Sequence, residues 1–306
     1  MDSKQIVFLD RMTKKIQTEK VYGKTCLEAL YGEGFFSGFL RCFLLPWIAC
    51  NSFSSRLYGW FQKSSFSKKK IEPFIKTYEM NVAEFLDPVS SFASFNDFFI
   101  RKLKEESRPL AQGRDVAILP ADARYLVYPD IDKADGFLVK GLKFSLQSFL
   151  QSEELENRYA QGSMVIARLC PTDYHRFHFP CNCLPSEPVL FPGDLYSVNP
   201  LALKRNIEIF SRNKRVRTVL KTKNFGEVLF VEIGATNVGS IHQKFTPFEP
   251  YAKGDEKGYF SFGGSSLVLL FEPGVIQFDQ DFLDASSEKL EVRGLMGQSM
   301  GRSLAF

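Results

Sequence analysis

From about Asp115 onward, the sequence consists of short β-rich runs separated by turn residues. This pattern limits the possible folds most, because β-branched and aromatic runs between turn residues predict strands. We expect only one helical segment among them, near Ser145–Arg158. Since this is not the strand–helix alternation of a parallel α/β protein, we predict a mainly antiparallel β domain over residues 106–306. The predicted strands are VAILP, RYLVYPD, GFLVKG, SMVIARL, HRFHFP, EPVLFPGDLYSV, RVRTVL, GEVLFVEIGA, VGSIHQKF, GYFSFGG, SSLVLLFEPG and KLEVRG.

Residues 1–105 have a different character, with helix formers, clustered aromatic residues and few β-branched runs. One helix is expected from Ser94 or Asn96 to about Glu106, with Pro109 beyond its end. The sequence therefore predicts an α+β fold, in which a helical N-terminal region of residues 1–105 precedes the β domain.

The most apolar window, residues 34–50, is too short and too interrupted to cross a bilayer. A membrane-spanning helix needs about 20 mostly apolar residues, and this window contains Arg41 and Pro46. An amphipathic helix lying in the membrane plane fits better, because cations including Lys68–Lys70 follow the aromatic residues. The alternative is a helix packed on the protein's own core. The aromatic residues at helical spacing are Phe35, Phe36, Phe39, Phe43 and Trp47.

The charge balance and the cysteines exclude other classes of function. Thirty-nine Lys and Arg against 35 Asp and Glu give a net charge of +4, too weak to indicate nucleic-acid binding. The six cysteines form no Cys-x-x-Cys pair and no disulfide framework, as expected in a reducing compartment. Cys181 and Cys183 would share one face of a strand, but two thiols make a poor metal site, so no metal is predicted.

Two of the three histidines, His175 and His178, lie in the run Pro171–Pro180. Either one could act as a general base near neutral pH. Residues three apart in a regular strand point to opposite faces. The two rings would therefore suit separate roles better than a shared metal site.

The sequence Gly263-Gly264-Ser265-Ser266 allows two interpretations. Paired glycines permit a tight hairpin turn. Alternatively, Ser265 is a nucleophile, a role that needs a base and a carboxylate to orient that base. His178 and Asp122, which lies in the turn Pro120-Ala121-Asp122, would supply these two groups. The sequence alone leaves open whether the three side chains meet.

Several motifs resemble those of the phosphatidylserine decarboxylases, in the same order and at the same spacing. The resemblance extends from about Phe95 to the C-terminus and includes the Asp122 turn, although Ala123 follows where the family usually has Gly. The first 90 residues are similar only in character, as a membrane-facing helical region. The matching motifs are VKGLKFSLQSFL, DYHRFHFP, GDLYSVNP, VEIGATNVGSI and KGDEKGYFSFGGSSLVLLFEPG.

This resemblance implies a proenzyme that cleaves itself at the Gly264–Ser265 bond, where the common family motif is Leu-Gly-Ser-Thr. Residues 1–264 would become the β chain and residues 265–306 the α chain. The two chains would stay associated as a heterodimer, and a further dimer of heterodimers is left open. Ser265 would be converted into a covalent pyruvoyl group, which serves as the cofactor.

The resemblance also implies a role for each site residue. His178, polarised by Asp122, would take the proton from the Ser265 hydroxyl during self-cleavage. The pyruvoyl group would then form a Schiff base with phosphatidylserine and release CO2, giving phosphatidylethanolamine. His175 would return a proton to the α-carbon.

A phospholipid substrate implies contact with a membrane. We expect a peripheral protein on an anionic surface, at the cytoplasmic face of the cell membrane. Two alternatives remain at this point. One is a serine hydrolase that uses Asp122, His178 and Ser265 without cleaving itself, and the other is a non-catalytic membrane-binding domain.

Overall fold

The computed structural model describes residues 6–21, 59–132, 145–203, 206, 208–235, 240–263 and 265–304. Three features predicted from the sequence lie outside these ranges: the aromatic window of residues 34–50, the run GFLVKG, and Gly264 on the amino side of the expected cleavage. Among the described residues, no helix is both long and apolar enough to cross a membrane.

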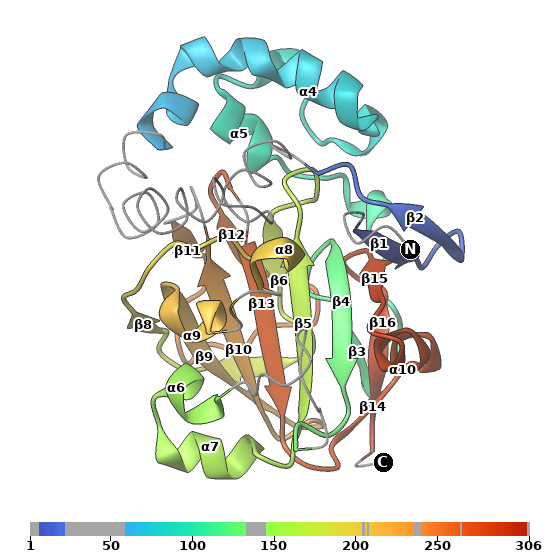
Figure 1. Cartoon of the computed structure of the whole chain (residues 1–306), viewed down its shortest axis with the longest axis vertical. Coiled ribbons are helices and arrows are strands. Elements are labelled where there is room, and N and C mark those ends of the chain that lie inside the picture. Colours follow the sequence, from blue (N-terminus) through green and yellow to red (C-terminus); the bar gives the residue numbers. More distant parts are fainter. Residues whose placement is uncertain are drawn as a thin grey trace, which may run out of the picture.

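A ten-stranded sheet forms the centre of the molecule (Figure 1). Its order is β2-β1-β15-β4-β5-β13-β10-β9-β7, and β8 also pairs with β9. All pairs are antiparallel except β1 with β15. The strands are β1 Val7–Asp10, β2 Lys15–Thr18, β4 Ala123–Tyr128, β5 Ser163–Leu169, β7 Cys183–Pro185, β8 Val189–Phe191, β9 Arg215–Thr222, β10 Glu227–Gly234, β13 Ser265–Phe271 and β15 Glu291–Gly294.

The middle strands of this sheet are apolar on both faces, which explains their central position. In β13, Leu267, Leu269 and Phe271 pack into one hydrophobic cluster. Val268 and Leu270 alternate with them and pack into a second cluster on the other face. The strands beside β13 are equally buried, so a continuous apolar run in the sequence has become a strand covered on both sides.

Two three-stranded sheets and several short helices complete the β domain. The first small sheet has the order β11-β12-β6 and the second β14-β16-β3. Their strands are β3 Val116–Ile118, β6 Arg176–His178, β11 Ile241–Gln243, β12 Glu256–Phe260, β14 Ile276–Phe278 and β16 Ser299–Ser303. The helices are α6 Leu146–Leu150, α7 Glu153–Tyr159, α8 Pro200–Leu203, α9 Ile209–Arg212 and α10 Gln280–Ser287.

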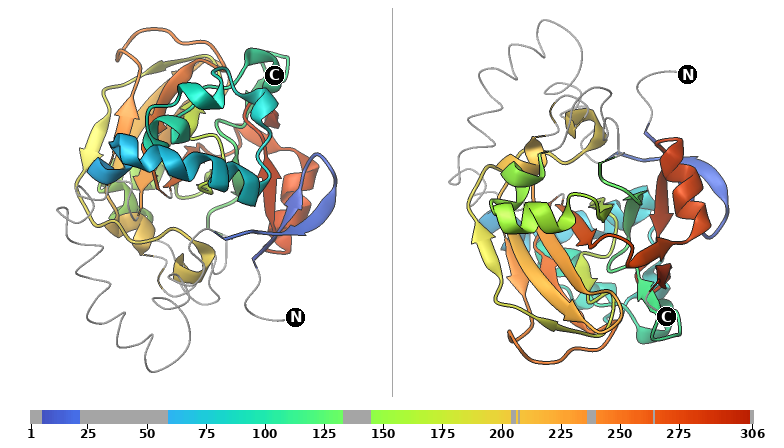
Figure 2. Two further views of the ribbon diagram at one scale, coloured as in Figure 1. Left: turned by 90° about the horizontal axis from the view of Figure 1, so that it is seen from above. Right: turned by 90° about the horizontal axis from the view of Figure 1, so that it is seen from below.

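A layer of short helices covers one end of the β domain, as Figure 2 shows from above. A cluster of buried phenylalanines holds this layer together and includes Phe262 from the β domain. Ser94 caps helix α5 by accepting a hydrogen bond from the Asp97 N–H, as Ser commonly does at a helix N-terminus. The elements are η1 Ser65–Lys70, α4 Ile71–Tyr78, η2 Val82–Glu84, η3 Val89–Ser91, α5 Phe95–Phe99 and η4 Glu105–Ser107.

The predicted α+β class is confirmed in its coarse form, a mixed α/β molecule with mostly antiparallel sheets. Every predicted strand within the described residues is present, and the helical segment near Ser145–Arg158 is the pair α6 and α7.

The prediction for residues 1–105 was wrong in two places. The helix expected to reach Glu106 ends at Phe99, because the chain then extends and pairs with the Phe85 segment, with Leu86 N–H bonded to the Lys102 carbonyl. In addition, β1 and β2 form a hairpin in the main sheet rather than a helix. Arg11 in its turn is paired with Asp279 and Asp281 near α10.

Candidate active site

Ser265 is the first residue of β13, the strand at the centre of the main sheet. It lies opposite Leu169 of β5 and Gly234 of β10. Its side chain is fully buried, and its Oγ has no hydrogen-bond partner among the described residues; the same is true of Ser266. A buried hydroxyl without a partner carries an energetic penalty, so the two serines are candidates for a chemical role.

The chain that leads into Ser265 is fixed by the N-terminal helical layer. Gly263 has a φ of +137°, a conformation that residues with side chains rarely adopt. Just before it, the Phe262 N–H donates to Asn96 Oδ1 of α5 at 3.0 Å. The Phe262 ring also packs on Phe95 and Phe99. Helix α5 therefore positions the segment that ends at the expected cleavage.

His175 is completely buried beside this segment. Its ring packs against Phe99, with ring centroids 3.9 Å apart, and its Nδ1 lies 3.0 Å from the Asp173 carbonyl oxygen. Burial lowers the pKa of His175 to about 4, although the Asp173 carboxylate and the carbonyls of Asp173 and Gly263 oppose this shift. Its Nε2 makes no hydrogen bond of normal geometry within the described residues. His175 is thus a neutral ring near the carbonyl of Gly263.

His178 ends the short strand β6 and has contacts at both ring nitrogens. Nδ1 lies 2.8 Å from the Gly254 carbonyl oxygen, and Nε2 lies 3.3 Å from the Tyr174 hydroxyl. A carbonyl only accepts, so Nδ1 carries the proton and Nε2 presents its lone pair to Tyr174. Burial lowers the pKa of His178. The ring is therefore neutral at pH 7, as a general base must be.

Asp122 lies in the turn before β4, and its carboxylate accepts hydrogen bonds from Arg108 and from the backbone of Met296. Arg108 Nη2 lies 2.6 Å from its Oδ2 and Arg108 Nε 2.9 Å from its Oδ1, while the Met296 N–H donates at 2.8 Å. The turn is close to His178, because the His178 N–H donates to the Pro120 carbonyl at 2.8 Å. The negative charge of Asp122 favours the protonated form of His178.

The structure places the turn of Asp122 close to His178, but no hydrogen bonds within the described part of the chain join the predicted triad. Among the described side chains, neither Asp122 and His178 nor His178 and Ser265 are hydrogen-bonded. The sequence did not reveal Arg108 as the partner of Asp122, nor Tyr174 as a partner of His178. Tyr174 lies in the same motif as the two histidines, whereas nothing in the local sequence marks Arg108.

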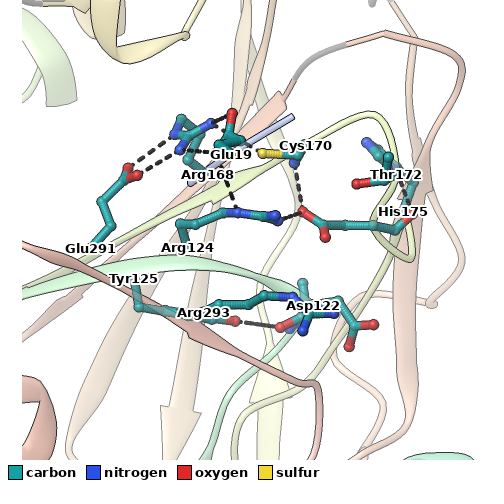
Figure 3. Close-up of polar contacts among 12 residues, drawn as sticks. Glu19, Asp122, Arg124, Tyr125, Arg168, Cys170, Thr172, His175, Glu291 and Arg293 are labelled. Atoms are coloured by element: carbon teal, nitrogen blue, oxygen red, sulfur yellow. Dashed lines mark hydrogen bonds and ion pairs between the residues drawn. The ribbon is translucent and has the colours of Figure 1, made fainter. Parts of the chain in front are cut away.

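A network of buried charges supports the loop before His175, as Figure 3 shows. Arg124 of β4 and Arg168 of β5 lie directly opposite each other. Arg124 binds the Asp173 carboxylate, which also accepts the Cys170 N–H at 2.7 Å. Arg168 binds two carboxylates, those of Glu19 and Glu291. Arg124 and Arg168 both lie within predicted strands of mostly apolar residues. Because buried charges are paired, such arginines were a signal that these partners exist.

A cavity of about 400 Å³ lies beside these groups, between the N-terminal layer and the β domain. Asp122 and Tyr174 line it together with four arginines: Arg101, Arg108, Arg124 and Arg293. The cavity is polar and its walls carry both charge signs. It is large enough to admit a small charged group beside Asp122.

Comparison with known proteins gives consistent matches. The family model described as phosphatidylserine decarboxylase matches residues 95–302. Relatives named phosphatidylserine decarboxylase proenzyme include one from Chlamydia pneumoniae, 49% identical over 97% of this chain and 97% of that protein. Another, from Chlamydia caviae, is 48% identical over 98% of this chain and 99% of its own length. A third, from Chlamydia trachomatis serovar D, is 44% identical over 99% of both.

Proposed function

Because this chain belongs to the phosphatidylserine decarboxylase family, we propose that it cleaves itself at the Gly264–Ser265 bond and then decarboxylates phosphatidylserine to phosphatidylethanolamine. The observation that carries this proposal is the Ser265 hydroxyl, which is buried at the start of the central strand, next to Gly263, and has no hydrogen-bond partner within the described part of the chain. The matches to proenzymes favour this function over a serine hydrolase and over a non-catalytic membrane domain.

Self-cleavage begins when His178 Nε2 takes the proton from Ser265 Oγ. To do so, Nε2 exchanges its contact with Tyr174 for one with Ser265, directly or through one water, since such contacts often tighten only during reaction. Oγ then attacks the Gly264 carbonyl carbon, and an ester bond replaces the peptide bond. Asp122 acts through its charge, which stabilises the imidazolium that forms.

The ester is then removed by elimination. A base takes the Ser265 α-proton, the Cβ–Oγ bond breaks, and the new carboxylate of residue 264 leaves. The dehydroalanine that remains adds water and loses ammonia, which leaves a pyruvoyl group at the start of residues 265–306. The site fits this conversion, because the Ser265 hydroxyl that disappears receives no hydrogen bond from the described residues.

The pyruvoyl group would supply an electron-withdrawing carbonyl that condenses with the substrate amine and accepts the electrons released with CO2. We assign His175 to the return of a proton to the substrate α-carbon. Because its pKa is low, the protonated ring is a stronger acid than an ordinary imidazolium. An anionic substrate beside it would favour that protonated form. Phe99 covers the ring and limits the access of water.

The positions of the strands support a stable association of the two chains after cleavage. Residues 265–304 contribute β13 and β15 to the main sheet and β14 and β16 to a small sheet. β13 pairs along its whole length with β5, so separating the chains would break the centre of the core. We therefore propose a permanent heterodimer of α and β chains, with a dimer of heterodimers as a possible larger assembly.

The outer side of the N-terminal layer has features suited to an anionic membrane surface. Trp60 is 70% exposed and Phe66 is 74% exposed. The cations Lys68–Lys70 follow directly along the chain, and aromatic side chains with nearby cations favour binding to anionic lipid. We propose that this layer docks the site at a membrane as a peripheral protein, on the cytoplasmic face of the cell membrane.

Intact-mass spectrometry of the denatured, reduced protein tests the proposal. We expect two species divided after Gly264, with the smaller one lighter by one ammonia than unmodified residues 265–306. Ser265→Ala should give one full-length species, whereas Ser266→Ala should still cleave. A wild-type chain that stays whole during long incubation with phosphatidylserine vesicles, yet releases CO2, would contradict the pyruvoyl route.

A further inference from the structure

Arg101 has a buried guanidinium group with donors that no described residue uses. Its side chain is only 5% exposed, and its Nη2 donates to the carbonyls of Thr172 and Asp173 at 3.1 and 3.2 Å. Its Nε and Nη1 have no hydrogen-bond partner within the described part of the chain. Buried donors without acceptors are unfavourable, and more so when they are charged. A bound group with acceptor oxygens would remove this penalty.

The charge of Arg101 is also not neutralised by an ion pair among the described residues. The carboxylates that act on it, Asp122 and Asp173, are bound to Arg108 and Arg124, respectively. Burial lowers the pKa of Arg101 to about 10, so the group remains positive at neutral pH. A buried cation requires a counter-charge, and the cavity that Arg101 lines gives an anion access to it.

Arg101 lies close to the proposed proton donor. Its Nη2 and the Nδ1 of His175 both contact the carbonyl oxygen of Asp173. The two side chains are therefore separated by no more than two hydrogen-bond lengths. The guanidinium carbon lies 5.0 Å from the ring centroid of Phe85 and 5.2 Å from that of Phe98. These rings hold the guanidinium in place through cation–π contacts.

We propose that Arg101 binds the phosphodiester of the substrate headgroup and so places the serine moiety beside His175 and Ser265. This inference rests on the function proposed above. Phosphatidylserine carries two anions, a phosphodiester and a carboxylate. A cation on the carboxylate would stabilise the bound substrate more than the transition state, because the carboxylate loses its charge as CO2 departs. The phosphodiester keeps its charge throughout, so Arg101 binds it without opposing the reaction.

The proposal predicts which kinetic constant depends on Arg101. Contact with a group that does not change during the reaction stabilises the ground state and the transition state equally, which affects KM rather than kcat. A charge-assisted hydrogen bond of this kind corresponds to a change of about 10- to 100-fold in binding. Removing Arg101 should thus raise KM by that factor and leave kcat within about 3-fold.

The test compares two short-chain substrates with the mature enzyme, dihexanoyl phosphatidylserine and its methylphosphonate analogue. In the analogue, a methyl group replaces the anionic oxygen on phosphorus, while the serine is unchanged. CO2 release gives kcat and KM for the wild type and for Arg101→Gln. Lys102→Gln is the matched control, because it removes the neighbouring positive charge, which is exposed.

The wild type and Lys102→Gln should prefer the charged substrate about 10- to 100-fold in kcat/KM. Arg101→Gln should lose this preference and keep its rate on the analogue. Equal losses on both substrates would overturn the proposal and point to the carboxylate. An unchanged preference, or no preference in the wild type, would also overturn it.

If Arg101→Gln does not mature, Arg101→Lys replaces it in the test. Its preference for the charged substrate should be weaker than that of the wild type but should not disappear. Failure of both variants to cleave themselves would overturn the proposal, since Arg101 would then serve the fold before lipid binds. A wild-type chain that neither cleaves nor releases CO2 would instead refute the proposed function.

Discussion

The carboxylate of Asp122 is bound by the guanidinium of Arg108, with Nη2 2.6 Å from Oδ2 and Nε 2.9 Å from Oδ1. Burial alone would lower the pKa of Arg108, but Asp122 and Glu84 raise it, so the cation persists. Arg108 therefore links the N-terminal layer, through Glu84, to the turn that carries Asp122. The orientation of this carboxylate depends on a segment distant from the catalytic motifs.

Replacing Arg108 should impair both stability and self-cleavage. Loss of one partner from a buried ion pair typically costs about 3–5 kcal/mol, so we expect Arg108→Met to unfold at a clearly lower urea concentration. Stability is measured in a Ser265→Ala background, which keeps the chain whole, and cleavage is followed by gel in the native background. In both stability and self-cleavage, Arg108→Lys should lie between the wild type and Arg108→Met. Wild-type cleavage in Arg108→Met would show that Asp122 needs no such support.

The three histidines should separate into three phenotypes. His178→Ala should remain uncleaved, because it removes the base that activates Ser265. His175→Asn should cleave, at least slowly, but release no CO2, because only the decarboxylation step uses its proton. His242, stacked on Tyr259 and bonded to Ser261 Oγ, is the matched control, and His242→Asn should cleave and release CO2 normally. Cleavage in His178→Ala would assign the base to another residue.

The sequence identified most strands but not the contacts that assemble the site. The run SMVIARL is apolar enough to predict β5, and in the structure every residue of this strand is buried. Strand β1 was missed because its partner β15 lies at the other end of the chain, and no local pattern shows such a pairing. Asp122, His175, His178 and Ser265 were selected as candidates from their chemistry, and their individual roles came from the family resemblance.

The arginines of the site were harder to find for a related reason. Arg101 lies where a helix was predicted to continue, and its surroundings come from the loop before His175. Only the tertiary fold brings these segments together. A sequence can show that a charged residue in a buried strand needs a partner, as for Arg168, but not which residue supplies it.

Acid should destabilise the folded chain through His175. Its pKa is about 4 when folded and near 6.5 when unfolded, so between these values the unfolded state binds more protons. Its contribution to stability is complete above pH 6.5 and is lost as pH falls to about 4, by up to about 3 kcal/mol. Urea unfolding of Ser265→Ala from pH 7.5 to 4.5, with and without His175→Gln, measures this difference. Parallel dependence of stability on pH in the two proteins would contradict the lowered pKa of His175.

Lys257 and Glu232 form a fully buried ion pair in the aromatic core, with Nζ 2.5 Å from Oε1. Thr218 and Gln243 complete the contacts of Lys257. Lys257→Met should destabilise the chain by about 3–5 kcal/mol, because it leaves a buried carboxylate unpaired. The double variant Lys257→Met with Glu232→Leu should recover much of that loss. Urea unfolding in the Ser265→Ala background tests this, and a double variant no more stable than the single one would contradict it.

Membrane binding should depend on the exposed aromatic side chains of the N-terminal layer. Trp60→Ser and Phe66→Ser together should weaken sedimentation with phosphatidylserine-containing vesicles at least about 10-fold, because both side chains are mostly exposed and free to enter the lipid interface. Self-cleavage should be unchanged, since neither residue contacts the site. Leu190 is the control, because it is 55% exposed and belongs to β8, a strand that lies away from this layer (Figure 1). If Leu190→Ser weakens vesicle binding as much as the double variant, the membrane surface is not the N-terminal layer.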